Sequence, residues 1–222
     1  MDKKSLSESD ICAKFITPAL VRSGWDESSQ IRREVSFTNG RILVRGKMVS
    51  RDKAKRADYI LYVRPNQPLA VFEAKDNNHG VGEGIQKANG YAHDLDIPFV
   101  FSSNGDGFRF LDRTVESGER ETDLTLEQFP PPANLWERYC AWKKFPNDVR
   151  KVVEQPYYAD GSGKEPRYYQ VNAVNAAVEA VAKVDELMAL VDRLEAKIVA
   201  SREAASRLLE AMVAELSGKA AA

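Results

Sequence analysis

The stretch from Asp58 to Lys75 constrains the fold of this chain more than any other part of its sequence. It contains two apolar runs, YILYV and LAVFEA, with the Val, Ile, Leu and aromatic content typical of buried strands. The segment RPNQP between them predicts a turn, so the two runs are expected to form a hairpin. Asp58 opens the first strand. Glu73 and Lys75 close the second strand on one face, because side chains two residues apart share a face.

Two carboxylates and a lysine at one end of a buried hairpin suit the metal-assisted cleavage of phosphodiester bonds. Burying such charges without partners is costly, so they call for mutual pairing or a metal ion. Asp58 and Glu73 would hold a hard cation such as Mg²⁺, with the main-chain carbonyl of Ala74 as a further ligand. Lys75 would orient or help deprotonate the attacking water and stabilise charge on the phosphate. The alternative interpretation is an edge hairpin with an ordinary surface ion pair.

The charge of the chain does not by itself indicate a nucleic-acid partner. The net charge of the 222 residues is -1, so a DNA contact would have to come from a local basic patch. The candidate is the run from Arg45 to Arg56, which includes Lys53 and Lys55. A solvated basic loop is the alternative interpretation of this run.

Cysteine usage and hydropathy indicate a cytoplasmic protein. Cys12 and Cys140 lie far apart in the sequence, as expected of unpaired thiols in a reducing compartment. The N-terminus is polar, and no apolar run is long enough to span a membrane. We therefore expect no signal peptide and no membrane partner.

The order of predicted elements indicates an α/β domain with a mixed sheet flanked by helices. In chain order we expect a helix over 7–24, strands over 30–37 and 40–49, the 58–75 hairpin, a helix over 83–95 and strands over 99–102 and 107–111. The dipeptide Asn39-Gly40 predicts a hairpin turn between the first two strands. Pro18 is expected to kink or divide the first helix. Glu8 at its start is either an auxiliary acid at the metal site or a first-turn capping residue.

Five segments of this sequence closely resemble the N-terminal nuclease domain of type I restriction enzyme R subunits. They are QIRREVSF, GRILVRGK, KRADYILY, PLAVFEAKDNNHGVGEGIQKANGYA and IPFVFSSNGDGFRFLDRT. The family belongs to the PD-(D/E)xK nucleases, which cut DNA with Mg²⁺. The resemblance implies a restriction-endonuclease-like fold, metal ligation by Asp58 and Glu73, and a catalytic role for Lys75.

The resemblance also implies a DNA contact on the helix that follows the catalytic strand, where the family carries a Q-x-x-x-Y motif. Tyr91 matches the tyrosine of that motif, but Lys87 stands at the glutamine position, with Gln86 just before it. A lysine can still reach a phosphate, as a point charge without the paired donor and acceptor of an amide. We therefore expect Gln86, Lys87 and Tyr91 to contact DNA, with Lys53, Lys55 and Arg56 as further basic contacts.

The likeness continues through LWERY and GKEPRYYQ, which in complete R subunits lead into an ATP-driven helicase motor. The resemblance implies that Gln170 corresponds to an adenine-contacting glutamine, present here as a remnant because the motor is missing. No G-x4-G-K-[S/T] motif is present, so the sequence does not predict nucleotide hydrolysis.

Residues 180–222 predict one long amphipathic helix. Apolar and small residues from Leu187 to Met212 recur in alternating steps of four and three, which is the coiled-coil period. The helix would associate with another helix or, alternatively, fold back on its own domain. The segments VAKVDELMALVDRLEAKI and ASRLLEAMVAEL resemble the C-terminal conserved helix of type I specificity subunits. The resemblance implies specificity and modification subunits as partners through 184–216, and a self-associating homodimer is the alternative.

We expect three parts: a nuclease domain over 1–145, a linker over 146–179 that resembles the entry to the missing motor, and an association helix over 180–222. The head would come from an R-type subunit and the tail from an S-type subunit. The predicted function is a Mg²⁺-dependent DNA endonuclease that has lost its motor. The alternative is a non-catalytic interaction protein that binds specificity or modification subunits through its tail.

Overall fold

A computed structural model of the protein describes residues 2–37, 42–45, 48–51, 55–64, 67–154 and 168–220. The chain divides into two compact units. The first unit comprises residues 1–145 and 155–174, and the second comprises residues 146–154 and 175–222.

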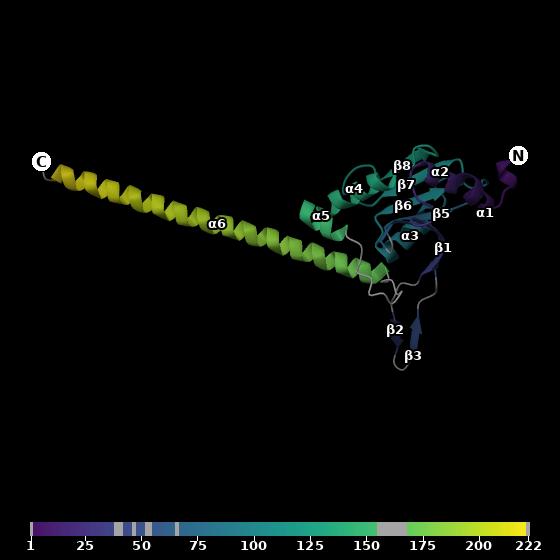
Figure 1. Cartoon of the computed structure of the whole chain (residues 1–222), viewed down its shortest axis with the longest axis horizontal. Helices are drawn as coiled ribbons and strands as arrows, with labels where there is room; N and C mark the ends of the chain where they lie inside the picture. The colour runs from purple at the N-terminus through teal and green to yellow at the C-terminus, as the bar shows by residue number, and fades with distance from the viewer. Residues whose placement is uncertain are drawn as a thin grey trace. The chain divides into compact units, whose positions relative to one another are not determined.

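A six-stranded sheet forms the centre of the first unit (Figure 1), and its mixed character is as the sequence predicts. In spatial order its strands are β1 (Ile31–Phe37), β4 (Lys55–Arg64), β5 (Gln67–Ala74), β6 (Phe99–Ser103), β7 (Gly107–Asp112) and β8 (Glu121–Thr125). The expected hairpin is confirmed, because β4 and β5 pair antiparallel. Strands β5 and β6 run parallel, and helix α3 (Ile85–Leu95) makes the crossover that a parallel pair requires.

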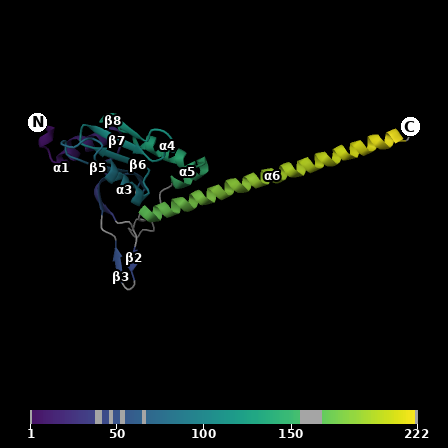
Figure 2. The same ribbon diagram turned by 180° about the vertical axis from the view of Figure 1, so that it is seen from behind.

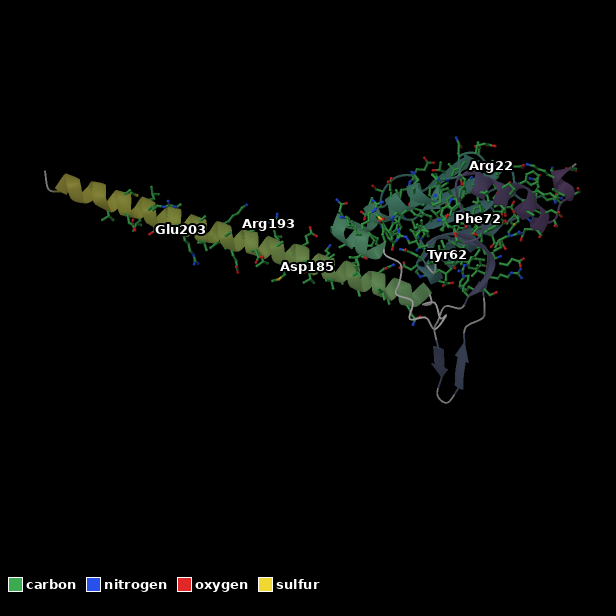
Figure 3. The ribbon with its side chains drawn as sticks, in the orientation of Figure 1. Arg22, Tyr62, Phe72, Asp185, Arg193 and Glu203 are labelled. Atoms are coloured by element: carbon green, nitrogen blue, oxygen red, sulfur yellow. The ribbon has the colours of Figure 1, made fainter. Side chains whose placement is uncertain are left out.

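The two faces of the sheet bury different side chains, because successive residues of a strand point to opposite faces. On one face, Val71 joins a cluster of apolar side chains from α3. The other face carries an aromatic cluster around Phe72, which is labelled in Figure 3. The ring centroid of Phe72 lies 5.7 Å from that of Phe101 and 5.5 Å from that of Phe108. Glu73 is two residues from Val71, so its side chain lies on the α3 face.

The N-terminal helical segment is present but irregular. In chain order it consists of a 3-10 turn η1 (Lys3–Ser5), α1 (Glu8–Ile11), a π-helical segment η2 (Cys12–Ile16) and α2 (Thr17–Arg22). Ser7 caps α1 in a reciprocal capping box with Asp10. Pro18 lies in the first turn of α2, directly after the π-helical segment. The proline thus divides the predicted helix, as expected, and the π-helical segment absorbs the irregularity.

The pairing of β1 differs from the sequence prediction. The strands expected over 30–37 and 40–49 do not pair with each other. Instead β1 pairs antiparallel with β4, with Ile31 opposite Leu61. A separate two-stranded sheet joins β2 (Ile42–Arg45) and β3 (Met48–Arg51). Ile31 and Phe37 at the ends of β1 are buried. Pairing with β4 places them in the main core, whereas a local hairpin would leave them exposed. The predicted Asn-Gly turn lies outside the described residues.

Among the described residues, three helices follow the strands of the sheet. Helix α4 (Pro132–Lys143) belongs to the first unit, and α5 (Asn147–Val153) belongs to the second. The long C-terminal helix is confirmed, but α6 (Tyr168–Ala220) begins earlier than the predicted 180 (Figures 1 and 2). Within the described ranges, no helix combines the length and apolar character that crossing a membrane requires.

Candidate active site

The β4–β5 hairpin brings the predicted catalytic residues to one place. Tyr59 pairs with Phe72 across the two strands, so Asp58 and Glu73 stand one step further along the same ladder. The backbone N–H of Ala74 donates a 2.7 Å hydrogen bond to Asp58 Oδ2. Lys75 follows directly after β5, and its N–H donates to the carbonyl of Ser103 on β6.

Asp58 lies in an environment that disfavours its charged form. Burial raises the pKa of the Asp58 carboxyl to about 6, and the Ala74 N–H that it accepts offsets part of this rise. The carboxylates of Glu73 and Glu8 raise its pKa further, whereas Lys87 lowers it. A cation held between Asp58 and Glu73 would relieve the repulsion between these two carboxylates.

Glu73 is a buried carboxylate whose two oxygens have different environments. Its residue exposure is 0%. Oε1 accepts hydrogen bonds from the Lys75 ammonium at 2.7 Å and from the Lys87 ammonium. Oε2 is buried and has no hydrogen-bond partner among the described residues. A buried carboxylate oxygen without a partner carries an uncompensated desolvation cost, which a bound cation would remove.

Lys75 connects the acidic residues of the site. Its Nζ donates to Glu73 Oε1 and, at 2.7 Å, to the carbonyl oxygen of Ala74. Glu8 Oε2 lies 3.6 Å from the same ammonium, so Glu8 borders the site from α1. Burial on its own would lower the pKa of Lys75, but its hydrogen bond and charge interaction with Glu73 raise the pKa above the ordinary value. Lys75 is therefore positively charged near neutral pH.

The donor set fits a small, hard cation. The structure brings together two carboxylates, Asp58 and Glu73, and the carbonyl of Ala74, which are the oxygen ligands that Mg²⁺ prefers. In the described part of the chain, no group of three His, Cys, Asp or Glu side chains is arranged to hold a metal. The remaining coordination positions would thus fall to water or substrate, as is usual for Mg²⁺.

Helix α3 approaches the site so closely that its start requires glycine. A Cβ atom on Gly84 would lie 2.9 Å from Glu73 Cγ and 3.2 Å from Ser102 Cβ. Gly84 is the N-cap of α3, so the positive end of the helix dipole lies beside the Glu73 side chain. No sequence motif singled out Gly84, because its role depends on how α3 docks on the sheet.

The three motif residues of α3 point in different directions. Lys87 reaches Glu73, and its Nζ also lies 5.7 Å from the ring centroid of Tyr91. Tyr91 is mostly buried and packs edge-on against Phe37 at 5.4 Å. Gln86 is exposed. The structure thus places Lys87 in contact with Glu73 and leaves Gln86 exposed.

A pocket of about 690 Å³ lies on the outer side of α3. Four basic side chains line it, together with Gln86: Lys55, His93, Arg113 and Arg120. Arg113 Nη1 donates to the carbonyl of Ile97 at 2.6 Å, and Arg120 Nη2 donates to that of Glu116 at 3.0 Å. Among the described residues neither arginine is in an ion pair. Sequence reasoning missed both, because α3 and the β7–β8 connection meet through tertiary packing.

The other predicted residues that the structure describes are engaged elsewhere than at Glu73. Lys55 is paired with Asp94 at 2.5 Å, and Arg56 is paired with Glu34 at 2.5 Å on the neighbouring strand. Gln170 lies in α6 with an exposed side chain. Lys53 lies outside the described residues.

Comparisons with known proteins agree with this geometry. Residues 44–119 match the family described as "Type I restriction enzyme R protein N terminus". The chain is similar to the type I restriction enzyme EcoAI endonuclease subunit of Escherichia coli. The two are 47% identical over 192 residues, which cover 86% of this chain and 24% of that subunit. This chain therefore spans about a quarter of the curated relative.

A solved structure gives the same result. The chain is similar to a fragment assigned as an HsdR subunit of a type I restriction enzyme from Vibrio vulnificus YJ016. The TM-score is 0.65 at 37% identity, and the match covers 79% of this chain and 32% of that chain. The family match contains the whole β4–β5 hairpin with Asp58, Glu73 and Lys75. Residues 44–119 of the first unit therefore match the N terminus of type I restriction enzyme R proteins, and the chain as a whole is similar to proteins of this kind.

Proposed function

We propose that the protein is a Mg²⁺-dependent DNA endonuclease of a type I restriction-modification system, acting in the cytoplasm. One observation carries the proposal: Asp58, Glu73 and Lys75 meet at one end of a buried hairpin, where Glu73 Oε2 has no partner among the described residues. A purely structural ion pair would leave no reason for that unpaired oxygen. Similarity to an endonuclease subunit of E. coli supports the same conclusion.

Each residue of the cluster has a distinct part in the proposed hydrolysis. Asp58, Glu73 and the Ala74 carbonyl would hold Mg²⁺, which when bound supplies charge stabilisation at the phosphate and a more acidic water. Lys75 is positively charged, so it acts as a hydrogen-bond donor and a positive charge rather than as a base. It would orient the attacking water and stabilise the negative charge that grows on the phosphate oxygens. Glu8 would help to hold the Lys75 ammonium in place.

The DNA backbone would run across the α3 side of this site. Lys87 and Tyr91 lie nearest to the catalytic cluster, and Gln86 lies at the pocket on the outer side of the helix. Lys53, Lys55 and Arg56 would add contacts further along the backbone. Phosphate contacts of this kind position a duplex without reading its sequence.

The tail would bring the nuclease to its place of action. We assign residues 1–145 to the nuclease domain, 146–179 to a linker that resembles the entry to a helicase motor, with Gln170 at the position of an adenine-contacting glutamine, and 180–222 to association. The partners would be type I specificity and modification subunits, or a second copy, through 184–216.

Metal-dependent nicking of plasmid DNA tests the proposed activity. The protein is expected to nick supercoiled DNA with Mg²⁺, alone or with specificity and modification subunits, and Asp58→Ala is expected to abolish nicking. The competing function is a non-catalytic protein that displaces intact subunits through its tail. In that case no nicking occurs under either condition, and Asp58→Ala leaves the displacement unchanged.

A further inference from the structure

Helix α6 presents a regular apolar stripe to its surroundings. The positions that follow alternating steps of four and three are Leu187, Val191, Leu194, Ile198, Ser201, Ala205, Leu208 and Met212. All eight are exposed, and the exposed fraction is 51% for Leu194 and 64% for Leu208. This spacing is the seam of a coiled coil, in which each side chain of the seam packs into a hole of a facing helix.

We propose that this seam pairs with the seam of a second copy in antiparallel orientation, about a two-fold axis between Val199 and Ala200. The seam consists of the a and d positions of the heptad repeat. In an antiparallel pair, each a position of one helix faces a d position of the other. Four different layers then form, and each occurs twice by symmetry. They join Leu187 to the partner's Met212, Val191 to the partner's Leu208, Leu194 to the partner's Ala205, and Ile198 to the partner's Ser201.

The sizes of the side chains favour this orientation. Ser201 and Ala205 are the two small residues of the seam, and each faces a large side chain in the antiparallel register. A parallel pair in register would stack Ser201 on the partner's Ser201 and Ala205 on the partner's Ala205. Two successive layers would then be underpacked, and cavities of this kind are destabilising.

The charges beside the seam favour the same orientation. In the antiparallel register Glu195 faces the partner's Arg202, and by symmetry this pair occurs twice. On the same flank Met188 faces the partner's Leu209, so two apolar side chains meet there. The parallel register would instead place Lys197 beside the partner's Arg202, which is a repulsive contact. In the described structure neither Glu195 nor Arg202 is engaged in an ion pair.

The antiparallel register also fixes the spacing of the two chains along the bundle. Asn175, the first residue of α6 in the second unit, would lie about 70 Å along the bundle axis from the partner's Asn175, at 1.5 Å per residue. The two chains would therefore enter the bundle from opposite ends. This inference concerns the tail alone and does not depend on the nuclease proposal.

Charge reversal distinguishes the two orientations. With the full-length chain, Arg202→Glu is expected to weaken the dimer about tenfold in sedimentation equilibrium, because Glu195 then faces the partner's residue 202 as a like charge at two places. The double exchange Glu195→Arg with Arg202→Glu should restore wild-type affinity. A parallel dimer predicts the opposite, since Arg202→Glu would relieve the contact with Lys197 and tighten association. A tighter dimer with this variant overturns the proposal.

Disulfide trapping gives an independent readout. Leu187→Cys chains and Met212→Cys chains are expected not to cross-link when each is oxidised alone, and to form a cross-linked dimer when they are mixed. The native thiols Cys12 and Cys140 are buried and serve as the internal control. Cross-linking of Leu187→Cys alone overturns the antiparallel register. If the chain stays monomeric and pairs only with a helix of a specificity subunit, the proposed self-association is wrong.

Discussion

Two ammonium groups share one carboxylate oxygen at the centre of the proposed catalytic site. Lys75 and Lys87 both donate to Glu73 Oε1, although family resemblance predicts a neutral glutamine at position 87. An extra positive charge beside a metal ligand opposes the binding of a cation. We infer that Lys87 weakens metal binding while keeping a phosphate contact.

Replacing Lys87 by glutamine is therefore expected to tighten Mg²⁺ binding. Lys87 is partly exposed, with 53% of its side chain accessible, so its effect is screened. We expect about a fivefold gain in affinity, corresponding to about 1 kcal/mol. Isothermal titration calorimetry without DNA measures it, and Lys14→Gln, which removes an exposed lysine paired with Asp10, serves as the control. Unchanged affinity in Lys87→Gln would refute the competition between Lys87 and the metal.

The raised pKa of Asp58 has a consequence for stability in the absence of metal. Its folded-state pKa of about 6 lies above the ordinary value of 3.8, so between these values the folded chain binds more protons than the unfolded chain. The free energy of unfolding should consequently rise as the pH falls through this window. Its contribution is complete below the unfolded pKa and is lost as the pH rises through 6.

Asp58→Asn isolates this contribution because it removes the titrating group and keeps an acceptor for the Ala74 N–H. Urea unfolding in EDTA at pH 7 and pH 4 should show that the wild type gains stability relative to Asp58→Asn at the lower pH. With Mg²⁺ the wild type should instead lose stability relative to Asp58→Asn at the lower pH, since the cation requires the ionised carboxylate. A wild-type advantage in EDTA that shrinks on acidification would contradict the assigned environment of Asp58.

At the scale of secondary structure, the close approach of α3 to β5 positions the Glu73 side chain. Gly84→Ala would force its Cβ against Glu73 Cγ at 2.9 Å, so either the carboxylate or the helix must shift. We expect a loss of about 1–3 kcal/mol in the free energy of unfolding, as for other overpacked positions, and a strong loss of nicking. Gly90→Ala on the same helix is the matched control, because a Cβ there meets nothing within 4 Å. Equal behaviour of the two variants would show that the close contact is unimportant.

The two arginines that line the pocket on the outer side of α3 are expected to contribute to the affinity for DNA. Arg113 and Arg120 line it and are held by backbone carbonyls, so their remaining N–H groups are available to phosphates. The double variant Arg113→Ala with Arg120→Ala should lower duplex affinity and reduce the slope of log affinity against log salt by about 2, since each phosphate contact contributes about 0.9. Fluorescence anisotropy in EDTA measures both without cleavage. Arg22→Ala on α2 is the control. An equal slope of log affinity against log salt in both variants would show that DNA does not contact the pocket.

Local sequence rules accounted for the hairpin and its trio. The two apolar runs, the Pro-containing turn and the two-residue alternation place Asp58, Glu73 and Lys75 together. Long-range packing decided the rest. The partner of β1 lies beyond an intervening two-stranded sheet, so the local Asn-Gly signal favoured the wrong pairing. The contact between Lys87 and Glu73 depends on the docking of α3, which no spacing within the helix reveals.

At the scale of the whole chain, the proposed nuclease domain is joined to a helix whose seam has the spacing of a coiled coil. The family match lies within the first unit, and the exposed heptad stripe lies within the second. The proposed chemistry and the proposed association therefore belong to separate units and can be tested independently. Reversal of the Arg202 charge should change association, and substitution of Glu73 should change cleavage, without either affecting the other.

The most direct test of the account is a plasmid-nicking assay at low salt with wild type and Glu73→Gln, with and without Mg²⁺. Glutamine keeps the shape of the buried side chain and removes the charge that Mg²⁺ requires. The account predicts nicking by wild type in Mg²⁺, none in EDTA, and a loss of at least about a hundredfold in Glu73→Gln, as expected when a group essential to charge stabilisation is removed. Circular dichroism should confirm that the variant is folded. Equal nicking by wild type and folded Glu73→Gln would contradict the assignment of the active site.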